Sequence, residues 1–125
     1  MAARIFTSFA IEDKAMRDLF VGHAKHDKVP YEFVDMSVKE PWDSSWKTQC
    51  RARITSCDGV IALITKNLKK GHGAIWEINC AKEEKIPLLG VYMKDCTIAD
   101  TPSELDGVKK VNWTWSNIAD FVNGL

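Results

Sequence analysis

The apolar run Gly59–Ile64 constrains the fold of this chain more than any other segment. It reads Gly-Val-Ile-Ala-Leu-Ile and contains no charged or hydrogen-bonding side chain. Such a run is typical of a strand buried on both faces of a parallel sheet. Pro87–Tyr92 is a second run of this kind, and a helix-like stretch separates the two. The sequence therefore predicts an α/β fold with helices on both faces of a parallel sheet.

The other segments also alternate between strand and helix patterns. We expect a first strand at Arg4–Phe9, a short second strand at Tyr31–Val34 and an edge strand near Val111. Helices are expected to begin near Glu12, at Asp43 or Ser44 as N-cap, at Ala74 and near Trp115. Right-handed crossovers then give one domain, residues 1–125, with a flavodoxin-like, three-layer, doubly wound sheet of strand order 2-1-3-4-5. Its ligand crevice would lie beyond the carboxyl ends of the first and third strands.

Composition narrows the class of partner and the compartment. Lys plus Arg is 17 and Asp plus Glu is 17, whereas nucleic-acid binders usually carry a clustered excess of basic residues. The four cysteines show neither CxxC nor zinc-type spacing with histidine, which favours free thiols in a reducing compartment. No apolar run approaches the ~20 residues of a membrane span. We therefore expect a cytoplasmic protein without a nucleic-acid partner, a membrane partner or a metal site.

Glu77 is the strongest candidate for a catalytic residue. A helical glutamate usually pairs with Lys or Arg three or four residues away, but here those positions hold Gly73, Ala74, Cys80 and Ala81. Small neighbours leave room around the carboxylate, in a helix that begins at the predicted crevice. The ordinary alternative is an exposed, unpaired glutamate, which is common on protein surfaces.

One carboxylate suffices for cleaving the nicotinamide–ribose bond of NAD. The leaving group is already a cationic pyridinium, so no general acid has to protonate it. The transition state resembles the oxocarbenium ion of glycoside hydrolysis, which a facing carboxylate stabilises or attacks. In this hypothesis NAD is the substrate, and no bound cofactor is required.

Four further residues are candidates for substrate binding, each with an ordinary alternative. Ser8 and Phe9 end the first strand, Trp42 lies in the loop after the second, and Trp76 precedes Glu77. The aromatic rings could stack on nicotinamide or adenine, or simply pack in the core. Ser8 could bind a ligand or end the strand as ordinary loop residues do.

Three stretches carry a family resemblance: Arg4–Phe9 with Glu12 and Asp13; Ser37–Trp42 with Trp46, Lys47 and Arg51–Ile54; and Gly59–Ile64 with Trp76, Glu77, Ile78, Ala81 and Ile86–Val91. Together they resemble the TIR-like domains of bacteria and archaea, a family that includes the TIR proteins of Thoeris antiphage systems. The similarity covers roughly residues 3 to 94. Many catalytic members read S-x-W-x-x-x-E before this helix. Here Gly71 and Gly73 stand at the serine and tryptophan positions.

The resemblance implies a TIR-like fold, NAD as substrate and Glu77 as the catalytic glutamate. It also implies self-association through TIR contacts, a phage-derived trigger, and an ADP-ribose-derived nucleotide that diffuses to a separate effector. Two other functions stay open at this point. One is a non-catalytic TIR scaffold that acts by homotypic assembly, and the other is a nucleoside deoxyribosyltransferase-like enzyme, which also uses a glutamate on an N-glycosidic bond.

Overall fold

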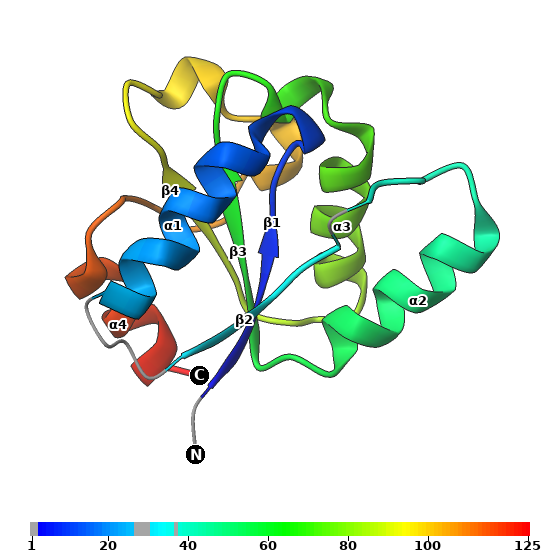
Figure 1. Ribbon diagram of the computed structural model, residues 1–125, viewed down its shortest axis with the longest axis horizontal. Helices are drawn as coiled ribbons and strands as arrows, with labels where there is room; N and C mark the ends of the chain where they lie inside the picture. Colours follow the sequence, from blue (N-terminus) through cyan, green and yellow to red (C-terminus); the bar gives the residue numbers. More distant parts are fainter. Residues whose placement is uncertain (1–2, 27–30, 37) are drawn as a thin grey trace.

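The computed structural model describes residues 3–26, 31–36 and 38–125, and its centre is a five-stranded sheet (Figure 1). The strands are β1 (Arg4–Ser8), β2 (Glu32–Val34), β3 (Gly59–Ile64), β4 (Leu88–Tyr92) and β5 (Lys110–Asn112). All neighbouring pairs are parallel, and the order is β2-β1-β3-β4-β5. The predicted fold class and strand order are confirmed.

Helices cover both faces of this sheet. Figure 1 shows α1 (Lys14–His26) and α4 (Trp115–Asn123) on one side, with α2 (Ser44–Thr55) and α3 (His72–Glu83) on the other. Short 3-10 turns lie at η1 (Ile11–Asp13), η2 (Leu68–Lys70), η3 (Ile98–Asp100) and η4 (Ser103–Leu105). In the described ranges no helix is both long enough and apolar enough to cross a bilayer.

Strand β3 has the burial that its sequence predicts. All six of its residues are buried. Ile61 and Leu63 pack in the cluster that includes α1 and α4, whereas Val60 joins the α2 and α3 side, as do Ala62 and Ile64. Because successive side chains of a strand point to opposite faces, an apolar side chain at every position serves both layers.

The boundary predictions need small corrections. Helix α3 begins at His72 instead of Ala74, and β1 ends at Ser8 instead of Phe9. Of the two proposed N-caps for α2, Asp43 is the one observed, since its carboxylate accepts the backbone N–H of Trp46 at 3.0 Å. In the structure the first turn of α3 lies against the end of β1 and the loop after β2.

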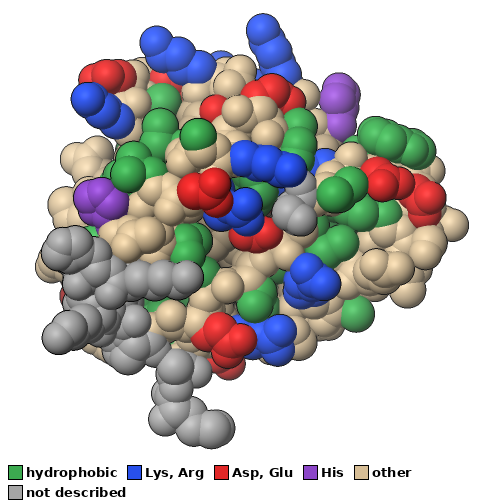
Figure 2. Space-filling view, in the orientation of Figure 1, with side chains coloured by type: hydrophobic (Ala, Val, Ile, Leu, Met, Phe, Trp, Pro, Cys, Tyr) green, Lys and Arg blue, Asp and Glu red, His purple; other side chains and the backbone are tan. Residues whose placement is uncertain are grey.

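Basic and acidic side chains are interspersed on the face drawn in Figure 2, and neither sign forms a broad patch among the coloured residues. This pattern agrees with the equal numbers of basic and acidic residues. The buried polar and charged side chains include Ser8, Lys39 and Glu77.

Candidate functional site

Glu77 lies in the second turn of α3, and its side chain points toward the sheet instead of the solvent. The residue is 0% exposed. Its Oε1 atom is 2.9 Å from the Oγ of Ser8, which is also 3.2 Å from the carbonyl oxygen of Ala74. A hydroxyl has one hydrogen to donate, so Ser8 donates either to a charged Glu77 or to Ala74 while accepting from a protonated Glu77. Ser8 can thus form a hydrogen bond with the carboxyl group of Glu77 whether that group is ionised or protonated.

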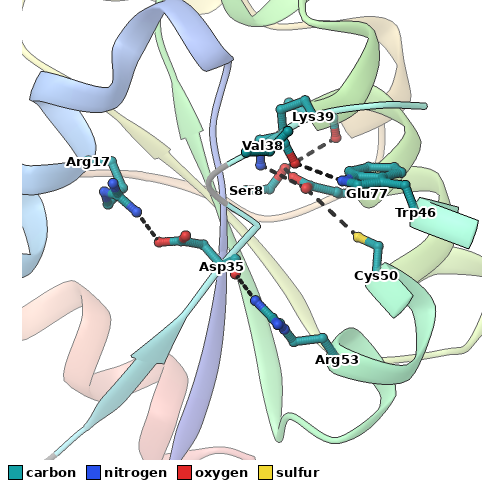
Figure 3. Close-up of polar contacts among 10 residues, drawn as sticks. Ser8, Arg17, Asp35, Val38, Lys39, Trp46, Cys50, Arg53 and Glu77 are labelled. Atoms are coloured by element: carbon teal, nitrogen blue, oxygen red, sulfur yellow. Dashed lines mark hydrogen bonds and ion pairs between the residues drawn. The ribbon is translucent and has the colours of Figure 1, made fainter. Parts of the chain in front are cut away.

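Lys39 supplies a cation for this carboxylate from a distant part of the chain. Its Nζ is 2.7 Å from Oε2 of Glu77, and the lysine side chain is only 4% exposed. The same Nζ lies 4.2 Å from the centre of the Phe9 ring. Figure 3 shows Lys39, Ser8 and Cys50 converging on Glu77 from the loop after β2, the end of β1 and α2. The room left by the small neighbours of Glu77 is therefore filled by Lys39.

Gly73 makes this arrangement possible. A Cβ atom at position 73 would lie 2.6 Å from the Cβ of Lys39, and 3.1 and 3.2 Å from its Cγ and Cδ. At position 71 a Cβ would lie 3.1 Å from the Cβ of Ala10. A tryptophan at position 73, as in the S-x-W-x-x-x-E pattern, could not coexist with Lys39 in this position. The glycine that replaces the tryptophan of the pattern is therefore what allows Lys39 to reach Glu77.

Residues 38–42, which we call the strap, carry Lys39 across the N-terminal turn of α3. The indole Nε1 of Trp46 donates to the carbonyl oxygen of Val38 at 2.7 Å. The backbone N–H of Asp43 donates to the carbonyl oxygen of Glu40 at 2.9 Å, which forms a turn before α2. Lys39 is the only side chain of the strap that is buried.

Burial dominates the electrostatics of Glu77. It raises the pKa of Glu77 to about 7, although Lys39 and the hydrogen bond from Ser8 act in the opposite direction. The thiol of Cys50 lies 3.8 Å from Oε2. Burial, with a further contribution from Glu77, raises the pKa of Cys50 well above its ordinary value. Cys50 is therefore a neutral thiol here, unsuited to act as a nucleophile.

A second ion pair lies on the other side of Phe9. The Nη1 atom of Arg17 is 2.5 Å from the Asp35 carboxylate, and these two side chains are 17% and 14% exposed. The guanidinium carbon of Arg17 is 5.0 Å from the centre of the Phe9 ring. Arg53 donates to the backbone carbonyl of Asp35 at 2.6 Å. The Phe9 ring is therefore in contact range of two cations, each of which is held by its own carboxylate.

The structure separates the predicted site residues into two places. Ser8 and Phe9 lie beside Glu77, and with Lys39 in place Phe9 is fully buried and offers no surface for a ligand to stack on. Trp42 is 77% exposed. It shares an open groove of about 470 Å³ with Trp76, and the groove is also lined by Pro41, His72, Ile75 and Asn79. Glu77 lines none of the grooves described for residues 3–26, 31–36 and 38–125.

Sequence reasoning missed Lys39, Arg17, Asp35 and Cys50 as neighbours of the site. Lys39 belongs to the stretch that carries the family resemblance, but it lies 38 residues from Glu77. A search for helical ion pairs at three or four residues cannot find a partner of that kind. The one local hint was Gly73, whose missing side chain signals a close approach by another segment.

Fold and site together define a doubly wound α/β domain with a buried carboxylate at the carboxyl end of its parallel sheet. A crystal structure of a prokaryotic SEFIR domain has this fold. It superposes with a TM-score of 0.60 at 12% sequence identity, covering 98% of this chain and 95% of that chain. No protein-family profile and no curated protein sequence matches the chain. The similarity therefore shows the fold, and the chemistry has to be argued from the site.

Proposed function

We propose that this chain is a TIR-like enzyme that cleaves the nicotinamide–ribose bond of NAD, with Glu77 as the catalytic carboxylate. The observation that carries the proposal is the position of Glu77, fully buried beside Ser8 at the end of β1. From β1 the chain continues to β2 at one edge of the sheet, and from β3 it continues to β4 toward the other edge, so the strand order reverses between β1 and β3. Doubly wound folds bind their ligands at this switch point. A buried carboxylate with a raised pKa at such a point is a candidate for chemistry.

The proposed reaction breaks the C1′–N bond, and nicotinamide leaves with the bonding electron pair. The ionised carboxylate of Glu77 stabilises the positive charge that develops on the ribose, or bonds to C1′ for one step. Water or another hydroxyl group then adds to C1′ and loses a proton. A pKa near 7 leaves a substantial fraction of Glu77 ionised at neutral pH.

This structure represents a closed form of the site, because the ion pair with Lys39 blocks access of substrate to the Glu77 carboxylate. Catalysis requires the strap to move away, which fits an enzyme that is inactive until triggered. The resemblance to Thoeris TIR proteins such as ThsB supports an ADP-ribose-derived signalling nucleotide as product, made in antiphage defence on a phage-derived trigger. Self-association through TIR contacts would be the step that moves the strap, and a separate effector would read the nucleotide.

The test is nicotinamide release from NAD by purified protein, with and without a crowding agent or phage lysate, resolved by chromatography. Glu77→Gln should abolish release. Glu83→Gln is the matched control, because Glu83 lies on the same helix with its side chain 63% exposed. Release that persists in Glu77→Gln would refute the assignment of Glu77. Base exchange on deoxynucleosides with inert NAD would instead identify a deoxyribosyltransferase-like enzyme.

One observation favours a second candidate, a non-catalytic TIR scaffold. The ion pair with Lys39 leaves Glu77 without access to any described groove, while Val38 and Trp42 of the strap are 54% and 77% exposed. In this alternative the strap is a contact surface and the ion pair is its structural support. Concentration-dependent self-association that Trp42→Ala weakens, without nicotinamide release under any trigger, would support the scaffold over the enzyme.

A further inference from the structure

The Lys39 ammonium is buried against two groups that favour a cation, the Glu77 carboxylate and the Phe9 ring. A carboxylate oxygen lies 2.7 Å from Nζ on one side, and an aromatic ring centre lies 4.2 Å away on another. Within the described part of the chain, Glu77 is the only hydrogen-bond acceptor of Nζ. A carboxylate combined with an aromatic face is the combination that recognises ammonium and pyridinium ligands.

We infer that this space is a binding pocket for an organic cation, an alkylammonium or N-alkylpyridinium group, and that Lys39 is its built-in occupant. The preference for a cation follows from Glu77 and Phe9 and does not depend on the reaction. The identification of the natural occupant as the pyridinium end of NAD rests on the proposed function. Lys39 would then compete with substrate for one carboxylate.

The neighbouring residues suit the pocket to a single cation. Ser8 is within hydrogen-bond distance of one carboxylate oxygen of Glu77, which leaves the other to Lys39 and the Cys50 thiol. Arg17 also approaches the Phe9 ring, but Asp35 and Asp18 hold its guanidinium. When Lys39 leaves, no other basic side chain among residues 3–26, 31–36 and 38–125 is in contact with the buried carboxylate, so an external cation can take that place.

Lys39 can leave without disrupting the core. It is the only buried side chain of the strap, and the other four positions are half-buried or exposed. The indole of Trp46 holds the strap through one hydrogen bond to Val38. Trp46 itself belongs to the apolar cluster under α2 and α3. A segment with so few buried contacts opens at low free-energy cost compared with unfolding of the domain.

The direct test is chemical rescue of Lys39→Ala, which empties the pocket but keeps its walls. Thermal midpoints are measured against increasing ethylammonium chloride, with sodium chloride at equal ionic strength and neutral propanol as reference additives. We expect a saturable rise in midpoint with ethylammonium only, with a dissociation constant in the millimolar range. Lys66→Ala, which removes an exposed lysine, and Lys39→Ala/Glu77→Gln should show no such rise.

A second variant keeps the inference testable if Lys39→Ala does not fold. Gly73→Ala places a methyl group 2.6 Å from the Cβ of Lys39, so the strap has to shift. In the parent protein an amine-acetylating reagent should modify Lys39 at least about tenfold more slowly than exposed Lys66, and 1-methylnicotinamide should speed that modification by displacing Lys39. In Gly73→Ala the two lysines should react at similar rates.

The outcomes distinguish the pocket from the enzyme. Rescue by ethylammonium without nicotinamide release from any variant would support the cation pocket and refute the NAD proposal. Nicotinamide release from Lys39→Ala without a saturable response to either cation would refute the pocket and leave the enzyme standing. Equal acetylation of Lys39 and Lys66 in the parent protein would also overturn the inference, because the lysine would not be occupying the pocket.

Discussion

Replacing Lys39 by methionine should destabilise the protein by an amount that grows with pH. Methionine has a similar length but no charge, so the change leaves Glu77 buried without its cation. Removing one partner of a buried ion pair costs about 3–5 kcal/mol when the remaining group stays ionised. Glu77 can avoid part of that cost by taking up a proton, because its pKa is already about 7 with Lys39 in place.

The pH dependence can be worked out from that pKa. At pH 6 Glu77 is mostly protonated in both proteins, so the two differ chiefly by the contacts of the lysine. At pH 8 the carboxyl group is mostly ionised in the parent protein, but loss of Lys39 raises its pKa further and keeps it protonated in the variant. One pKa unit corresponds to 1.36 kcal/mol, so Lys39→Met should cost about 1.4 kcal/mol more at pH 8 than at pH 6.

Urea unfolding at the two pH values measures this difference directly. Lys66→Met is the control for loss of an exposed lysine and should show no comparable pH dependence. Lys39→Met/Glu77→Gln lacks the titrating carboxyl group, so its loss of stability relative to Glu77→Gln should be the same at both pH values. An equal cost of Lys39→Met at pH 6 and pH 8 would refute the assignment of the raised pKa to Glu77.

Three further predictions concern the same region. Because the pKa of Glu77 in the folded state lies above its ordinary value of 4.5, its contribution to stability is present below pH 4.5 and lost as pH rises through 7, about 3 kcal/mol in all. Glu77→Gln should flatten that part of a stability–pH profile recorded by urea unfolding. Asp35→Asn removes a negative charge that raises the pKa of Glu77 and leaves Arg17 without its partly buried partner, so it should shift the profile to lower pH and cost about 1–3 kcal/mol. Trp46→Ala should cost about 3–5 kcal/mol by leaving a core cavity, whereas exposed Trp42→Ala should change thermal stability by less than about 0.5 kcal/mol.

The architecture was predictable because its signals are local and repeated. Gly59–Ile64 is apolar throughout, and burial on both faces is the one setting in which a strand needs that pattern. Strand order then followed from alternating elements and right-handed crossovers. The exact start of α3 was missed because Gly71 and His72 carry no capping signal, and no side chain caps that helix.

The site was predictable only in part, because it depends on contacts between distant segments. The small residues around Glu77 correctly indicated space beside the carboxylate, but sequence spacing could not reveal that Lys39 fills it. Phe9 and Trp42 looked equally suited to stack on a ligand, yet one is fully buried and the other 77% exposed. Their difference comes from the path of the strap, which no periodic pattern encodes.

The choice of residues around Glu77 is hard to explain by stability alone. A buried ion pair is often no more stabilising than apolar residues of the same shape. Glycine is a poorer helix former than alanine, and at Gly73, in the first turn of α3, the missing Cβ admits Lys39. Lys39, Gly73 and Glu77 are each unfavourable taken singly, and they meet at the carboxyl end of the sheet. Local conflicts of this kind concentrate at functional sites. A Lys39→Met/Glu77→Leu variant that is as stable as the parent protein would show that folding does not require the pair, leaving function as the reason for it.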